Sequence, residues 1–116
     1  MVSRLEITRQ YSATRLITAA HPQIIRLMHA NCVLLVKQSF STDPVHRRNL
    51  LVHAQNLLAE LEASLKITDE VSKGLFYLYD YCYCLLESND PANHNLVVTV
   101  LSLLRDTFTI LLKKRN

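Results

Sequence analysis

Residues 43–65 read DPVHRRNLLVHAQNLLAELEASL and carry a clear helical pattern. Asp43 suits the N-cap, where a carboxylate accepts backbone N–H groups, and Pro44 suits the first helical position, where no N–H is needed. Apolar residues then recur every three or four positions, at Leu50, Ala54, Leu57, Leu61 and Leu65. This spacing places them on one side of an α-helix, so we predict an amphipathic helix over 44–66.

The same start signal occurs at two other places, His21-Pro22 and Asp90-Pro91. A fourth start lies at Thr68, which is followed by two acidic residues that suit the first turn of a helix. These signals predict helices over 22–41, 69–88 and 91–114. A shorter amphipathic piece over about 3–15 precedes them.

The connections between the predicted helices are short, so neighbouring helices must run antiparallel. We predict an all-α fold, an antiparallel up-down four-helix bundle with a short N-terminal amphipathic segment. The chain is expected to form a single domain over 1–116, with an N-terminal cap segment at 1–17 and the bundle at 22–114.

Composition narrows the class of protein. The chain has 116 residues, of which 49% are hydrophobic and one is glycine, so disorder and glycine-rich phosphate loops are excluded. The N-terminus lacks the apolar core of a signal peptide, and the longest strictly apolar run, 32–36, is too short to span a membrane. Three cysteines in apolar segments favour a reducing compartment. We expect a soluble cytoplasmic protein without membrane insertion.

Three of the predicted helices are apolar over more than one face. Helix 69–88 has a predicted core seam at Val71, Leu75, Leu78, Cys82 and Leu85. A second apolar row lies about 100° away around the helix, at Phe76, Tyr79, Tyr83 and Leu86. Helix 91–114 likewise has a seam at Val97, Leu101, Leu104, Phe108 and Leu111 and a row at Leu96, Val100, Leu103 and Ile110. Helix 22–41 is apolar almost all round, with Asn31 as a polar group expected to hydrogen-bond inside the bundle. Such excess apolar surface favours a binding surface over ordinary core packing.

No pattern of catalytic or metal-binding residues is present. No glutamate has a histidine three residues later, so a di-iron bundle is excluded. Cys82 and Cys84 face different directions on a helix, and a zinc site at His29, Cys32 and His53 is a weaker explanation than packing. The basic clusters Arg47-Arg48 and 113–115 are too small and too separated to follow a nucleic acid backbone. We therefore expect no enzyme activity, metal, cofactor or nucleic acid partner.

One run of residues resembles the FliS family of flagellin export chaperones. The run is Leu75-Phe76-Tyr77-Leu78-Tyr79-Asp80-Tyr81, followed by Leu85-Leu86, Asn89-Asp90 and Leu103-Leu104-Arg105-Asp106. Upstream, Tyr11, Ile17-Thr18-Ala19 and Gln23-Ile24-Ile25 are similar to the family's N-terminal tyrosine, Thr-Ala segment and first long helix, and Leu57, Leu61 and Leu65 match a later stretch. Departures occur at His29, Ala30 and Asn31, where the family has Tyr/Phe-Asp-Gly, at the shifted Pro22, and at Phe108, where tryptophan is common.

The resemblance implies a cytoplasmic chaperone of flagellar type III secretion that binds the disordered C-terminal region of flagellin, or a related export client, and prevents premature self-association. An export-gate component is a further possible partner. The excess apolar surface places the partner contacts at Ile7, Tyr11, Ile25, Met28, Phe76, Tyr79, Tyr83, Leu86, Leu96, Val100, Leu103 and Phe108. The identity of the client and the role of Asp80 stay open.

An alternative explains the same apolar surface. A non-catalytic structural or regulatory bundle would cover its excess apolar faces permanently in a homodimer. The two hypotheses differ in the mass of the protein in solution and in its response to a client peptide.

Overall fold

The structure, a computed structural model, describes residues 22–66 and 70–115, with side chains for residues 23–66 and 70–110. It contains the helices α2 (Pro22–Ser39), α3 (Pro44–Ser64), α4 (Glu70–Glu87) and α5 (Pro91–Arg115), and the described residues form no strand. Every helix end lies within two residues of the predicted one. The predicted all-α class is therefore confirmed, whereas the predicted N-terminal segment lies outside the described residues.

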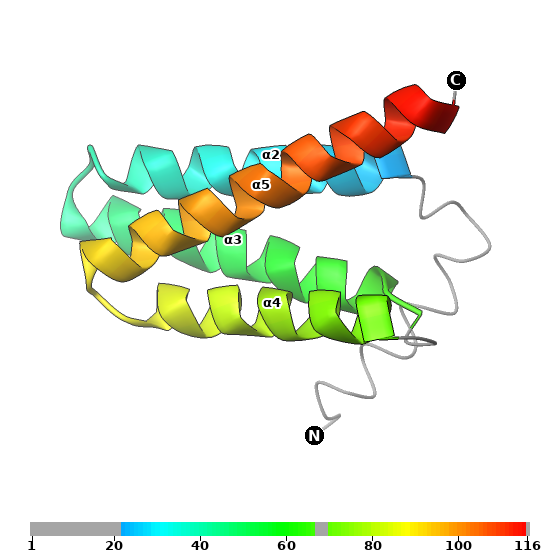
Figure 1. Cartoon of the computed structure of the whole chain (residues 1–116). Coiled ribbons are helices and arrows are strands. Elements are labelled where there is room, and N and C mark those ends of the chain that lie inside the picture. The colour runs from blue at the N-terminus through cyan, green and yellow to red at the C-terminus, as the bar shows by residue number, and fades with distance from the viewer. Residues whose placement is uncertain (1–21, 67–69, 116) are drawn as a thin grey trace.

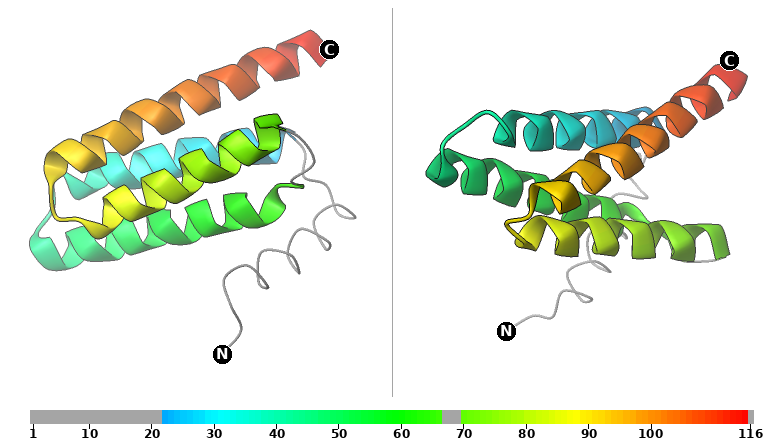
Figure 2. Two further views of the ribbon diagram at one scale, coloured as in Figure 1. Left: turned by 60° about the horizontal axis from the view of Figure 1, so that its bottom comes forward. Right: turned by 60° about the vertical axis from the view of Figure 1, so that its left-hand side comes forward.

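The four helices run alternately up and down (Figure 1). α2 packs against both α3 and α5, and α3 also packs against α4. Among neighbouring helices contact is weakest between α4 and α5, although only a short loop separates them. α5 begins close to α4 and moves away from it toward its C-terminal end (Figures 1 and 2). The second half of α5 therefore packs mainly on α2.

Two helix starts are capped as the sequence predicts. Asp43 Oδ1 accepts hydrogen bonds from the backbone N–H groups of Val45 and His46, at 3.1 and 3.0 Å. Asp90 Oδ1 accepts one from Ala92 N–H at 3.0 Å. The hydrogen bonds from the His46 backbone and side chain lower the pKa of the exposed Asp43 carboxyl group, so Asp43 stays ionised at the N-terminus of α3, where the helix dipole favours an anion.

The core runs along the inside of the bundle. Its fully buried apolar residues are Met28, Cys32, Val33 and Val36 from α2, Leu51, Ala54, Leu58 and Leu61 from α3, Tyr79, Cys82 and Leu86 from α4, and Val97 and Leu101 from α5. Among the described residues, α5 contributes the fewest of these, because it lies over one side of the bundle and leaves much of its own apolar surface uncovered.

Two leucines on α5 differ in burial, so we expect their substitution to affect the stability of the fold differently. Leu101 is 0% exposed and Leu103 is 63% exposed. We expect Leu101→Ala to lower the free energy of unfolding by about 2–5 kcal/mol, because it leaves a cavity. The control Leu103→Ala should change it by no more than about 0.5 kcal/mol. Urea unfolding measures both, and equal losses would show that Leu103 is also part of the core.

Candidate functional site

A buried polar contact joins α2 to α4 in the middle of the bundle. The side chain of His29 is 0% exposed and that of Tyr79 is 1% exposed, and His29 Nε2 lies 2.8 Å from the Tyr79 hydroxyl oxygen. The His29 ring also lies against Phe108 of α5, with 5.2 Å between ring centroids. His29 thus contacts both α4 and α5, which pack against each other less than the other neighbouring helices do.

Burial sets the charge state of this contact. It lowers the pKa of His29 from 6.5 to about 4, so the imidazole is neutral near pH 7. Burial also raises the pKa of the Tyr79 hydroxyl group, which therefore keeps its proton. His29 Nδ1 is buried without a hydrogen-bond partner among the described residues, so the hydroxyl of Tyr79 satisfies only one of the two ring nitrogens.

Two cysteines lie beside this contact and are unreactive. Burial raises the pKa of both Cys32 and Cys82 to about 12, and for Cys32 the neighbouring Cys82 adds to the effect. The Cys32 thiol donates a hydrogen bond to the carbonyl oxygen of Ala54 at 3.3 Å. Thiolate chemistry needs a lowered pKa and access to solvent, so both residues act as core side chains. The described residues contain no group of three or more metal ligands placed to hold an ion.

The predicted partner-binding residues fall into four groups. Leu96 and Leu103 are exposed, whereas Ile25, Phe76, Tyr83, Val100 and Phe108 are half-buried. Met28, Tyr79 and Leu86 are buried in the core. Ile7 and Tyr11 lie outside the described residues. The isolated bundle therefore presents Leu96 and Leu103 directly to a partner and presents five other residues in part.

The buried face of α4 matches neither predicted row as a whole. Leu78 and Val71 of the core seam are 38% and 73% exposed, whereas Cys82 of the seam is buried together with Tyr79 and Leu86 of the second row. These three buried residues are spaced three and four positions apart, so they share a face that lies between the two predicted rows. The prediction that Asn31 hydrogen-bonds inside the bundle is also wrong, because this side chain is exposed on the outer side of α2.

Exposed and half-buried apolar side chains form a row along α5. They are the residues of the second row that the sequence predicts for this helix. Leu96, Leu103 and Ile110 are 45%, 63% and 56% exposed, and half-buried Val100 lies between the first two. The spacing of four, three and seven residues keeps these four side chains on one face of the helix. We call this set, Leu96, Val100, Leu103 and Ile110, the α5 row.

Arg47 and Arg48 form only a small basic cluster in the sequence, but in the structure both arginines bind the ends of other helices. Arg47 donates from Nε to Ser39 O at 3.0 Å and from Nη2 to Thr42 O at 3.1 Å, just beyond α2. Arg48 donates from Nη1 to Leu86 O at 2.9 Å and from Nη2 to Asn89 Oδ1 at 2.9 Å, at the end of α4. A cation at a helix C-terminus compensates the carbonyl groups that lack intrahelical partners.

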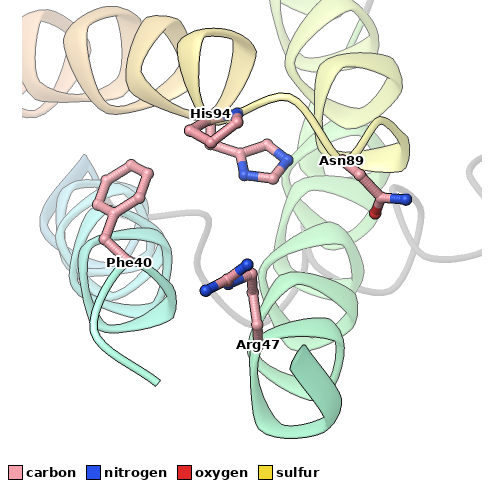
Figure 3. Close-up of a pocket in the computed structure, with 5 residues that line it drawn as sticks. Phe40, Arg47, Asn89 and His94 are labelled. Atoms are coloured by element: carbon pink, nitrogen blue, oxygen red, sulfur yellow. The ribbon is translucent and has the colours of Figure 1, made fainter. Parts of the chain in front are cut away.

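These contacts lie at the end of the bundle that contains residues 40–43 and 88–90, which we call the loop end. Figure 3 shows Arg47 extending from α3 between Phe40 and Asn89, toward His94 at the start of α5. His94 is 2% exposed, and its Nε2 donates to Ser88 O at 2.7 Å. The sequence alone does not predict this arrangement, because basic residues in the first turn of a helix do not specify which other helix end they contact.

The fold and the α5 row define an all-α bundle with an exposed apolar face suited to protein binding. The family model described as flagellar protein FliS matches residues 4–115, and the chain belongs to that family. Membership supports a role as a flagellar export chaperone. Comparisons with curated proteins and with solved structures find no match. No helix within the described ranges is long and apolar enough to cross a membrane.

A matched pair of tyrosine substitutions tests the buried contact. Tyr79→Phe removes the hydroxyl that satisfies His29 Nε2, and we expect it to lower the free energy of unfolding by about 1–3 kcal/mol. Tyr77→Phe is the same change at a side chain that is 60% exposed, and it should have an effect within about 0.5 kcal/mol. Urea unfolding compares the two, and a neutral Tyr79→Phe would contradict the assigned hydrogen bond.

The lowered pKa of His29 predicts acid sensitivity. Between pH 6.5 and about 4 the unfolded chain binds a proton at His29 that the folded chain does not, so stability is complete above this window and falls as the pH drops through it. The loss should total about 3 kcal/mol. His29→Gln removes this titration. Tyr79, Cys32 and Cys82 stay neutral over this pH range both in the original protein and in the variant. Unfolding measured at several pH values should therefore show a shallower pH dependence for His29→Gln, and equal slopes would refute the assignment.

Proposed function

We propose that the protein is a non-enzymatic cytoplasmic chaperone that binds the disordered C-terminal region of flagellin, or of a related export client, before type III export. The observation that carries this proposal is the α5 row, exposed on a helix of a chain that belongs to the FliS family. Contiguous exposed apolar surface is uncommon on a protein that works alone and marks a place where another chain packs.

The α5 row suits a client segment that folds on contact. A disordered segment can lay apolar side chains, spaced three or four residues apart, along a helical face and gain order at the same time. Each exposed leucine of the row contributes on the order of 1 kcal/mol when it is covered. Covering the client's own apolar residues in the same step would prevent the client from associating with other copies of itself.

The half-buried members of the predicted set extend this contact. Phe76 and Tyr83 on α4, Phe108 on α5 and Ile25 on α2 each keep part of their surface accessible. We propose that the client also touches these side chains. Met28, Tyr79 and Leu86 support the shape of the surface from within, because a client can reach them only if the helices move apart.

A charge placed in the α5 row tests the proposal. Leu103→Glu would bury a carboxylate against an apolar client segment, and we expect it to weaken binding of a flagellin C-terminal peptide by about tenfold or more. The matched control is Val52→Glu on α3, an exposed apolar residue on a different helix, and it should bind the peptide normally. Calorimetric titration measures both affinities, and circular dichroism confirms that both variants are folded.

The mass of the protein in solution, measured by light scattering, distinguishes the chaperone hypothesis from the homodimer hypothesis. A chaperone should gain the mass of the peptide, whereas a permanent dimer formed through the α5 row should show twice the chain mass and no response to the peptide. In the dimer case Leu103→Glu would produce monomers. That result, or normal peptide binding by Leu103→Glu, would overturn the proposed client surface.

A further inference from the structure

The loop end contains adjoining cavities that share their walls. A cavity of about 120 Å³ is lined by Phe40, Arg47, Asn89, Pro91 and His94 (Figure 3). It shares Phe40 and Pro91 with a cavity of about 320 Å³ and shares Arg47 and Asn89 with another of about 190 Å³. The three form one groove across the loop end, and none of its lining residues belongs to the α5 row.

One end of the groove is cationic, and its charge is only partly compensated. Arg47 and Arg48 both line the 190 Å³ cavity and are half-buried. In the described part of the chain their acceptors are carbonyl and amide oxygens, and neither guanidinium forms an ion pair with a carboxylate. A helix C-terminus supplies roughly half of a negative charge. About half of each arginine charge therefore remains for another group.

The carboxylates nearest in sequence already have partners. Asp43 accepts hydrogen bonds from the Val45 and His46 backbone N–H groups and contacts the His46 ring. Asp90 accepts from Ala92 N–H. Both aspartates cap helices, so moving either of them onto an arginine would leave a helix start without its cap. These two aspartates therefore stay at their own helix starts and do not neutralise the groove.

Arg47 also retains donors for a ligand. A guanidinium group carries five N–H groups, and the printed contacts of Arg47 use its Nε and Nη2 atoms, which leaves Nη1 without an acceptor among the described residues. Planar carboxylates match the fork of a guanidinium group and form charge-assisted hydrogen bonds with it. The chemistry at this end of the groove is therefore that of carboxylate recognition.

The other end of the groove is apolar. Phe40 is 41% exposed although it is a large aromatic side chain, and it borders two of the three cavities beside Pro91. A small inorganic anion would leave this surface uncovered. A peptide that carries a carboxylate next to an apolar side chain would neutralise Arg47 and cover Phe40 together.

We propose that the groove at the loop end binds an acidic segment of a partner protein, with a carboxylate on Arg47 and a neighbouring apolar side chain against Phe40. The proposal does not depend on the proposed client surface, because it uses different residues at a different place on the bundle. It assigns a second protein-binding site to the chain, selective for negative charge.

Titration of the full-length, ¹⁵N-labelled protein with short peptides tests this site by NMR. The probe is a tetrapeptide with blocked ends that contains glutamate, leucine, aspartate and phenylalanine, and its control has glutamine and asparagine in place of the two acids. We expect the acidic probe to shift the amide signals of Phe40, Arg47 and Asn89. The control peptide should bind with an affinity at least about tenfold lower. Inorganic phosphate should neither reproduce these shifts nor displace the probe.

Matched variants then assign the contacts. Arg47→Gln should weaken the acidic probe by about tenfold, and Lys37→Gln, which removes a cation that lines none of the three cavities, should leave binding unchanged. Because Arg47 also holds the end of α2, Phe40→Ser provides a second variant that keeps the arginine in place and should weaken the probe several-fold. No shifts with the acidic probe, equal binding of both peptides, full displacement by phosphate, or normal binding by Phe40→Ser would each overturn the proposal.

Discussion

The first turn of α3 holds the ends of its neighbours, and the arrangement of the bundle depends on it. Asp43 caps α3 itself, Arg47 binds the carbonyl groups of Ser39 at the end of α2 and of Thr42 beyond it, and Arg48 binds the end of α4. Burying these ends without partners would leave several backbone carbonyl groups without hydrogen bonds, at a cost of about 1–3 kcal/mol for each. Six residues, 43–48, thus start one helix and fix two others. At the opposite end of the bundle α5 lies away from α4 (Figure 2).

His29 has a comparable role in the middle of the bundle. It bonds to Tyr79 and packs on Phe108, so one side chain of α2 connects α4 with α5. Neither His29 nor Phe108 is a member of the exposed α5 row, so this contact among three helices is separate from that surface.

The sequence predicts the helices better than it predicts their faces. Aspartate-proline and histidine-proline pairs mark helix starts through local chemistry, so the bounds could be read without tertiary information. On α4 two apolar rows lie about 100° apart, and periodicity alone cannot rank them. The face that is buried combines residues of both rows, and it meets partners such as His29, which is fifty residues from Tyr79 in the chain. On α5 the predicted ranking is correct for Leu101 and Leu103. The groove at the loop end could not be predicted, because it forms between two stretches, 40–48 and 89–95, that lie far apart in the chain.

The exposed α5 row also affects how the free protein behaves at high concentration. Apolar side chains that await a partner are equally able to meet another copy of the same chain, and a net charge of +3 gives little mutual repulsion. The uncomplexed protein should therefore be prone to reversible self-association, most of all in high salt, where the remaining repulsion is screened. Production together with a client that covers the row would raise the yield of dispersed protein. The same surface that suits binding thus limits the concentration at which the free protein stays dispersed.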